Sequence, residues 1–311
     1  MAYRFPRCQI TPQPLDQVSF QIDGIERLRW HFGAEYPRPF FYPLLGPSRS
    51  SLTRLGHPGA PNHDHHRSIW FAHAKVLGID FWSDSTAARI RQKHWLCYQD
   101  GDHEAAMAVA LGWYDGHDPQ ELLEQELVAA VRPGAEGETC LELQATFRPR
   151  AESLEFGQTN FGFLAVRVAK SLSAYFGGGE IVSSEGAKGE PAIFGQPARW
   201  MDYSGPMPNG SPGGTTEGLT YFDHPSNPGR PAHWHVREDG WMGAAPCMNG
   251  PLETSRENPL TLRYLLHAHR RPLDPVRANV LAAEFTASPG FEVVKAEVKH
   301  TQSAIRRKKG V

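Results

Sequence analysis

Apolar and polar residues alternate with a period of two along several segments of the chain, and this pattern limits the fold more than any other feature. Alternation places apolar side chains on one face of a strand and polar side chains on the other. The first such segment contains Asp23-Gly24, which favours a tight hairpin turn because glycine tolerates a positive φ. The alternating segments are residues 18–25, 138–147, 161–168, 260–269 and 291–298, and residues 122–131 are interpreted as a further strand.

The remaining composition favours the same fold class. The chain contains 30 glycines and 26 prolines, which indicate many turns between short strands rather than long helices. We therefore predict an all-β fold with mostly antiparallel sheets. Residues 1–311 contain no fixed-period repeat and no low-complexity linker, so we expect one domain. The basic C-terminal residues 301–311 are expected to form a disordered tail.

Charge and hydropathy exclude several kinds of partner. The formal net charge is −2 and the isoelectric point is about 6.7, so nothing indicates binding to nucleic acid or to an anionic membrane. No window approaches the ~18 consecutive apolar residues that a membrane helix needs. The N-terminus lacks the apolar core of a signal peptide, and the four cysteines are scattered, as in a reduced protein. We expect a soluble, cytoplasmic protein.

Histidine is the residue type that indicates chemistry, since the chain has 15 of them and two segments concentrate them. The first runs from Asn62 to Arg67. If it enters a strand, His63, His65 and Arg67 share one face, and the intervening side chains share the other. Such a His-x-His pair could hold a metal ion with a third ligand from elsewhere, or bind a polyol or carboxylate. The alternative is that these histidines only brace a loop.

The second segment spans residues 223–237 and ends in a strand-like pattern. On an extended strand His233, His235 and Arg237 point to one side, while Trp234 and Val236 point to the other. One face is then polar and the opposite face apolar. This arrangement is typical of a strand that forms the floor of an open site above a packed core.

Three further polar residues and one aromatic residue complete the candidates. Asp223 and His224 precede a proline-rich turn, where a short carboxylate can orient an imidazole. Asn227 lies in the same turn and either contacts a ligand or fixes the backbone. Trp200 could stack on a sugar ring, although a core position is the alternative. The sequence contains no phosphate-binding glycine loop, no G-x-S-x-G and no H-E-x-x-H.

Short stretches around these segments resemble the PmoA-like family, catalogued as methane oxygenase PmoA. The resemblance implies a β-sandwich similar to the mutarotase-like supersandwich. Because family members occur beside sugar-oxidising dehydrogenases, it also implies a sugar or modified sugar as the substrate. The matching stretches are residues 38–47, 52–54, 63–73, 81–82, 184–186, 198–205, 222–228 and 234–237.

The first functional hypothesis is an enzyme that acts on a carbohydrate by hydrolysis, elimination or epimerisation. The second is a non-catalytic carbohydrate-binding protein, and the third, from the family title, is a copper or iron oxygenase. No cofactor is specified, and mechanisms with and without a divalent transition metal remain open. The assigned roles are acid/base catalysis for His65, His235, His224 and Asp223, substrate binding for Arg54, Arg67, Arg237, Asn227 and Trp200, and metal binding for His63, His65, His66 and His235.

Overall fold

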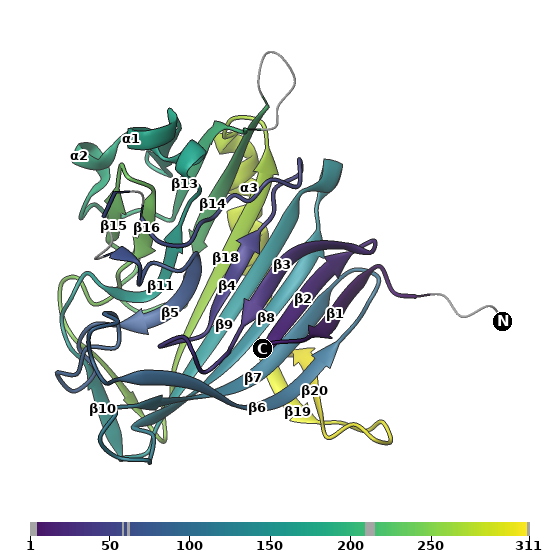
Figure 1. Ribbon diagram of the computed structural model, residues 1–311, viewed down its shortest axis with the longest axis vertical. Coiled ribbons are helices and arrows are strands. Elements are labelled where there is room, and N and C mark those ends of the chain that lie inside the picture. The colour runs from purple at the N-terminus through teal and green to yellow at the C-terminus, as the bar shows by residue number, and fades with distance from the viewer. Residues whose placement is uncertain (1–4, 58, 61–62, 209–214, 310–311) are drawn as a thin grey trace.

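Antiparallel strand pairing accounts for most of the structure, a computed structural model that describes residues 5–57, 59–60, 63–208 and 215–309. Within these residues two sheets of eight strands are formed (Figure 1). The first has the spatial order β1-β2-β3-β4-β5-β11-β16-β15. Its strands are β1 Cys8–Gln13, β2 Gln17–Ile22, β3 Ile25–His31, β4 Phe40–Leu44, β5 Ile69–His73, β11 Gly162–Arg167, β16 Trp241–Ala244 and β15 Trp234–Arg237.

The second sheet has the order β12-β13-β14-β18-β9-β8-β7-β6 and contains the longest strands. Two further pairs, β10 with β17 and β19 with β20, lie outside the main sheets. The second sheet comprises β12 Glu180–Ser183, β13 Trp200–Pro206, β14 Thr216–Asp223, β18 Leu260–Arg270, β9 Thr139–Pro149, β8 Leu123–Pro133, β7 Ala105–Tyr114 and β6 Arg89–Gln99. The smaller pairs comprise β10 Ser153–Phe156, β17 Leu252–Ser255, β19 Phe291–Lys295 and β20 Ser303–Arg307.

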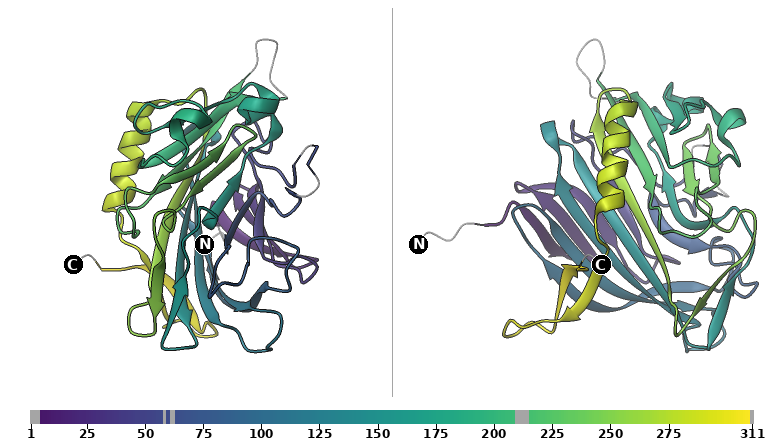
Figure 2. Two further views of the ribbon diagram at one scale, coloured as in Figure 1. Left: turned by 90° about the vertical axis from the view of Figure 1, so that its left-hand side faces the viewer. Right: turned by 180° about the vertical axis from the view of Figure 1, so that it is seen from behind.

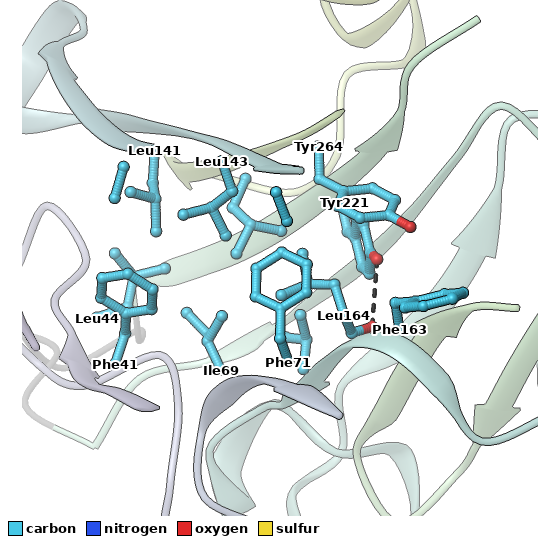
Figure 3. Close-up of a cluster of buried hydrophobic side chains, with 14 of the residues drawn as sticks. Phe41, Leu44, Ile69, Phe71, Leu141, Leu143, Phe163, Leu164, Tyr221 and Tyr264 are labelled. Atoms are coloured by element: carbon cyan, nitrogen blue, oxygen red, sulfur yellow. Dashed lines mark hydrogen bonds between the residues drawn. The ribbon is translucent and has the colours of Figure 1, made fainter. Parts of the chain in front are cut away.

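The two large sheets pack face to face around one apolar core, which confirms the antiparallel β-sandwich. Phe71 and Leu164 of the first sheet face Leu143 and Tyr264 of the second sheet in this core (Figure 3). The hydroxyl of Tyr221 on β14 donates to the carbonyl oxygen of Leu164 on β11, at 3.2 Å. This bond ties the second sheet to the strand that later supplies part of the site.

The predicted hairpin at Asp23-Gly24 is also confirmed. Asp23 and Gly24 have φ values of 52° and 73°, and Ile22 pairs with Ile25 across the turn. Two consecutive positive φ angles define the type I′ turn that matches the twist of the flanking strands. The alternation of apolar residues on either side of the turn then fixes which side chains face the core.

One helix of appreciable length is present in the described residues, and the sequence pattern does not indicate it. This helix, α3 Pro275–Ala287, is capped at its N-terminus by Asp274, whose carboxylate accepts from the backbone N–H groups of Val276 and Arg277. It covers the outer face of the second sheet (Figure 2). None of the helices in the described residues has the length and apolar character needed to cross a bilayer. The short helical segments are η2 Ala135–Gly137, η3 Lys170–Leu172, α1 Ala174–Gly177 and α2 Glu190–Ile193.

The expected disordered tail over residues 301–311 requires correction, because residues 303–307 form β20 and pair with β19. Arg307 fastens this hairpin to the second sheet, where it forms ion pairs with Glu104 at 2.6 Å and with Glu142 at 2.8 Å. Its guanidinium also lies 3.8 Å from the ring centroid of Phe291. Arg306 and Arg307 therefore belong to a docked strand rather than to a free end.

Candidate functional site

A second apolar cluster lies on the outer face of the first sheet, away from the core of the sandwich. On β5, Ile69 and Phe71 belong to the core, whereas Trp70 and Ala72 belong to this outer cluster. Trp241 on β16 and Trp82 from a loop join them, with ring centroids 5.3 Å apart. A sheet that is apolar on both faces must be covered on both, so loops pack over this outer face.

A pocket of about 380 Å³ opens between that outer face and its covering loops. Strands β11, β15 and β16 supply one part of its wall, and loop residues supply the rest. Both histidine-rich segments contribute to it, although they lie far apart in the chain. The lining residues are His63, His65, His66, Ala74, Asp80, Trp82, Ser83, Phe161, Arg167, His235, Arg237, Asp239 and Trp241.

The strand half of the pocket follows the alternation expected from the sequence. His235 and Arg237 on β15 line the pocket, while Trp234 and Val236 between and beside them are buried in the core. His233, the third residue of the expected polar face, precedes the strand and lies beside Asn249, with contacts of 3.1–3.2 Å, outside the pocket lining. The strand thus presents two of the three predicted polar residues to the pocket.

The loop half differs from the predicted strand. His63 to His66 form a tight turn, in which the backbone N–H of His66 donates to the carbonyl oxygen of His63 at 3.0 Å, and β5 begins only at Ile69. Asn62, the first residue of the predicted segment, lies outside the described residues. The turn gathers the imidazoles more tightly than a strand would, because the ring centroids of His65 and His66 are 4.3 Å apart.

His66 is the deepest of these histidines. Its ring lies 5.7 Å from the ring of Trp70 and 5.0 Å from that of Trp241, measured between centroids. Burial, with a smaller contribution from His65, lowers the pKa of His66 well below its ordinary value. Burial also lowers the pKa of His63, with His57 next in effect. Both rings are therefore held in surroundings that disfavour a positive charge.

His235 is a buried imidazole with a defined orientation. Its Nδ1 lies 3.1 Å from the backbone carbonyl oxygen of Asn160. A carbonyl oxygen can only accept, so Nδ1 carries the proton and Nε2 keeps its lone pair. Burial lowers the pKa of His235 to about 4, so the ring is neutral at pH 7. The rings of Phe161, Phe194 and Trp241 surround it at centroid distances of 4.9, 5.4 and 5.6 Å.

Asp239 contacts three basic side chains at one side of the pocket. Its Oδ1 accepts from Nη1 of Arg167 at 2.7 Å, and its Oδ2 lies 2.8 Å from Nε2 of His57. Its backbone carbonyl oxygen accepts from Nη2 of Arg54 at 2.6 Å. Burial alone would raise the pKa of Asp239, but Arg167 and His57 lower it below its usual value. Arg54 therefore lies at the edge of the site without lining the pocket.

The two other predicted arginines have separate acidic partners. Nη2 of Arg67 lies 2.7 Å from Oδ2 of Asp84. The other carboxylate oxygen of Asp84, Oδ1, forms an ion pair with Nη2 of the buried Arg38 at 3.0 Å. Arg237 donates to Glu190 on α2 at 2.7 Å, and its guanidinium lies over the ring of Phe194. Of the three arginines predicted to bind substrate, Arg237 alone is among the residues that line the pocket.

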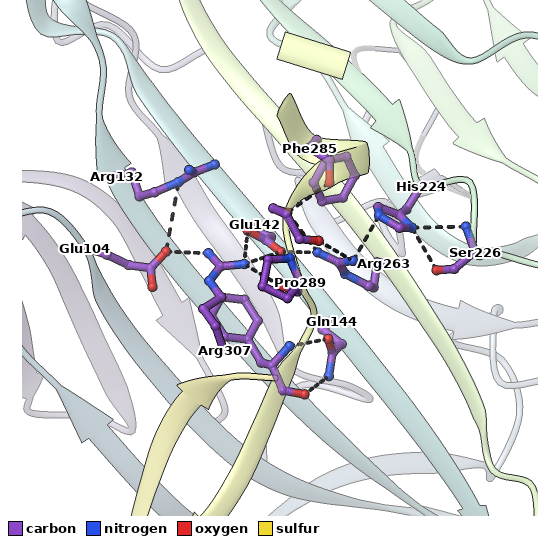
Figure 4. Close-up of polar contacts among 12 residues, drawn as sticks. Glu104, Arg132, Glu142, Gln144, His224, Ser226, Arg263, Phe285, Pro289 and Arg307 are labelled. Carbon is purple, nitrogen blue, oxygen red and sulfur yellow. Dashed lines mark hydrogen bonds and ion pairs between the residues drawn. The ribbon is translucent and has the colours of Figure 1, made fainter. Parts of the chain in front are cut away.

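Asp223, His224 and Asn227 do not join this site. Nδ1 of His224 lies 2.7 Å from the hydroxyl of Ser226, and its Nε2 lies 2.9 Å from Nη1 of Arg263 on β18 (Figure 4). Asn227 donates to Asp223 at 2.7 Å and accepts from the backbone N–H of Arg263 at 2.8 Å. These residues brace a turn at the second sheet, so the catalytic and binding roles expected for them are not supported by their position.

Trp200 is also a structural residue. It is 1% exposed and packs below α3 with Phe222, Leu265 and Phe285, on the outer face of the second sheet. Its indole N–H donates to Asn279 of α3 at 3.1 Å. The sequence allowed either a sugar contact or a packed core position for Trp200. The structure places it in a packed position.

The tentative metal-binding set of His63, His65, His66 and His235 is not arranged as a ligand group. Within residues 5–57, 59–60, 63–208 and 215–309, no three His, Cys, Asp or Glu side chains come together closely enough to hold a metal ion. The imidazoles of His63, His65 and His66 are near neighbours by ring centroid, at 4.3–5.9 Å, but do not form a ligand group with His235.

Sequence reasoning missed several residues that define the pocket. Arg167 and Trp241 lie on strands β11 and β16, and Asp239 lies in the turn before β16. Trp82, which lines the pocket from a loop, belongs to the outer apolar cluster. A signal for Arg167 existed, because a single arginine at the end of an otherwise apolar strand needs a buried partner.

The fold and the pocket together define an antiparallel β-sandwich with a histidine- and arginine-lined pocket on the outer face of one sheet. The chain belongs to the family of unknown function DUF6807, whose model matches residues 17–283. This match overturns the assignment to the PmoA-like family, and the oxygenase hypothesis, which came from that family's title, loses its basis. The motifs behind that assignment were short, whereas the DUF6807 match covers most of the chain.

No curated protein matches the chain. Among solved structures, the 4-alpha-glucanotransferase from Thermococcus litoralis is similar with a TM-score of 0.32 and 10% sequence identity. The similarity covers 87% of this chain and 40% of that chain, so the present chain spans less than half the length of that protein.

Proposed function

We propose that the protein is an enzyme that acts on a carbohydrate in the pocket between β11, β15, β16 and their covering loops. The observation that carries the proposal is the meeting of two distant histidine-rich segments at one pocket, with His65 from the first and His235 from the second. A pocket with aromatic walls and a few polar groups is the usual form of a small-molecule site. A role for these histidines in a loop brace alone would not require both segments to reach the same cavity.

The aromatic residues suit a sugar. Trp82, Phe161 and Trp241 line the same pocket as the histidines and Arg237. Aromatic faces pack against the apolar C–H faces of a sugar ring, while polar side chains bind the hydroxyl groups around its edge. Phe161 is 38% exposed, which places one aromatic ring within reach of an entering ligand.

His235 is the candidate base. Its neutral ring, with the proton fixed on Nδ1 by Asn160, offers the lone pair of Nε2 to a hydroxyl or an acidic C–H of the substrate. His65 from the opposite segment would return a proton, and Arg237 would bind a substrate oxygen. This pair fits hydrolysis, elimination or epimerisation, because each of these reactions needs one proton removed and another delivered.

The test is a panel of sugars, glycosides and 3-keto sugars, incubated with the wild type in ²H₂O and followed by NMR. Product formation reports hydrolysis or elimination, and incorporation of deuterium at carbon reports proton abstraction. We expect His235→Ala and His65→Ala to lose turnover by a factor of about 10²–10⁴ with melting temperatures within a few degrees of the wild type. His94→Ala on the exposed side of β6 is the matched control and should retain activity.

Two outcomes would contradict the proposal. Binding of panel sugars without turnover, unchanged by the two variants, would favour a non-catalytic carbohydrate-binding protein. Collapse of the fold in His235→Ala, with His65→Ala as active as the wild type, would make His235 a structural residue.

A further inference from the structure

The pocket contains more hydrogen-bond donors than it can satisfy by itself. Arg167 is fully buried, and its Nε and Nη2 have no hydrogen-bond partner among the described residues. The indole N–H groups of Trp82 and Trp241 are likewise buried without a partner in the described part of the chain. Buried donors are nearly always paired in folded proteins, so four such groups at one pocket indicate a missing acceptor.

The two carboxylates of the pocket, Asp239 and Asp80, in contrast already accept hydrogen bonds. Asp239 receives Arg167 on one oxygen and His57 on the other. Oδ1 of Asp80 accepts from the backbone N–H groups of Trp82 and Ser83 at 2.6 and 3.1 Å. A ligand that completes this site must therefore bring acceptors and few donors. A neutral sugar brings a hydrogen with every hydroxyl group, whereas a carboxylate brings acceptor positions alone.

Two clusters of charged residues beside the pocket each contain two arginines and one aspartate. Arg167 contacts the carboxylate of Asp239, and Arg54 donates to the backbone carbonyl oxygen of the same residue. Burial together with the Arg167 charge lowers the pKa of Arg54 to about 10. On another side, Arg38 and Arg67 share the single carboxylate of Asp84. Each of these groups has two cations for one anion. A buried excess of positive charge is stabilised by an anionic ligand.

The unpartnered atoms of Arg167 also match a carboxylate in shape. Nε and Nη2 form the lateral edge of a guanidinium, which binds the two oxygens of a carboxylate in parallel. Arg7 uses this edge elsewhere in the chain, where its Nε and Nη2 each donate to one oxygen of Asp23 at 2.8 Å. In Arg167 the same edge remains open, because Asp239 occupies Nη1.

We propose that the pocket takes a sugar acid, with its carboxylate bound by the Nε/Nη2 edge of Arg167 and by the indole N–H groups of Trp82 and Trp241. This inference rests on the proposed carbohydrate function and narrows it to one substrate class. The sugar ring then lies toward His235, whose neutral Nε2 is placed to act on a C–H or hydroxyl group. Arg167 is a binding residue in this scheme, and Asp239 positions it.

The experiment compares ligands that differ only in the acidic group. Glucuronate is paired with glucose, and galacturonate with galactose, and binding is measured by isothermal titration calorimetry on the full chain. We expect the wild type to bind at least one acid at least 10-fold more tightly than its neutral partner. Trp241→Phe, which keeps the ring and removes the N–H, should reduce that preference several-fold. Arg167→Lys should abolish it, because an ammonium group lacks the two-pronged edge.

Matched controls lie outside the pocket. Trp95→Phe on β6, which packs against Phe32, and Arg306→Lys on the exposed face of β20 should keep the wild-type preference. If Arg167→Lys fails to fold, Trp82→Phe and Trp241→Phe alone decide the result, since both retain the aromatic packing.

The outcomes separate this inference from the function on which it rests. Equal binding of acids and neutral sugars would overturn the sugar-acid inference and leave the carbohydrate function intact. Binding of acids that is unaffected by all three pocket variants would also overturn it, because the carboxylate would then lie elsewhere. A third outcome is that no sugar of either pair binds, while the wild type binds malonate and Arg167→Lys does not. This result would support the anion site and contradict the carbohydrate function.

Discussion

Replacement of His235 by glutamine should make the stability of the protein less sensitive to acid. Burial lowers the pKa of His235 from 6.5 to about 4 in the folded chain. In the unfolded chain the imidazole takes up a proton near pH 6.5, so acid favours the unfolded state first. The stability associated with the neutral ring is therefore complete above pH 6.5 and is lost as the pH falls toward 4.

The size of the effect follows from the two pKa values. The full difference of 2.5 pKa units corresponds to about 3.4 kcal/mol, and linkage places about 2 kcal/mol of it between pH 7 and pH 5. Urea unfolding followed by tryptophan fluorescence at both pH values measures this loss. His235→Gln should lose about 2 kcal/mol less than the wild type over that interval. His94→Gln, at an exposed position on β6, should lose as much as the wild type.

A single result would refute the reasoning. If His235→Gln and the wild type lose the same free energy of unfolding between pH 7 and pH 5, His235 is not held neutral by burial. The argument that its Nε2 acts as a base near neutral pH would then fail as well, because both rest on the same buried, uncharged ring.

Three further predictions concern the scaffold and the pocket floor. Arg263→Met should lower the free energy of unfolding by about 3 kcal/mol, measured by urea unfolding. The reason is that the fully buried Glu142 pairs with Arg263 and Arg307 in the described residues and would keep Arg307 alone. The control Arg306→Met, at an exposed position, should change the free energy of unfolding by less than about 0.5 kcal/mol. Asp274→Ala removes the N-cap of α3 and should cost about 1 kcal/mol in the same assay. Gly243 pairs with His235 between β15 and β16, and a Cβ there would already be in van der Waals contact with the indole of Trp241 at 3.5 Å. The two γ-methyl groups of valine extend one bond further, so Gly243→Val should weaken sugar binding at least 10-fold in calorimetry with little change in melting temperature.

Most of the strand framework could be predicted from the sequence because alternation is a local property. The segments at residues 138–147 and 260–269 became β9 and β18, and the ambiguous segment at residues 122–131 became β8. Helix α3 was not predicted, because only Ala278 and Phe285 of its residues are buried and its sequence therefore shows no apolar stripe. Its one sequence signal was Asp274 before Pro275, an N-cap followed by a proline in the first turn.

The two halves of the site were predictable to different degrees. His235 and Arg237 followed from alternation on a strand, whereas His63 to His66 were placed on a strand and in fact form a turn. A turn depends on hydrogen bonds such as that from His63 to the carbonyl oxygen of Ala60, and on the positive φ of Ser68, neither of which a periodicity argument detects. Proximity in sequence was also misleading for Asp223. It ends β14 in the second sheet, and the chain then crosses to β15 in the first sheet before it reaches His235.

The division of the pocket between a sheet and a loop has a consequence for how it can work. Arg167, His235 and Trp241 are fixed by paired strands whose opposite face is buried in the core, so their positions are costly to change. His63 and His65 lie on a turn whose backbone bonds are local and can rearrange without disrupting a sheet. In the proposed reaction the base, His235, is therefore held rigidly on a strand. The proton donor, His65, lies on a turn that can adapt to the substrate. On this argument, ligand binding should slow amide hydrogen exchange in residues 63–68 far more than in β15, and equal protection of both would contradict it.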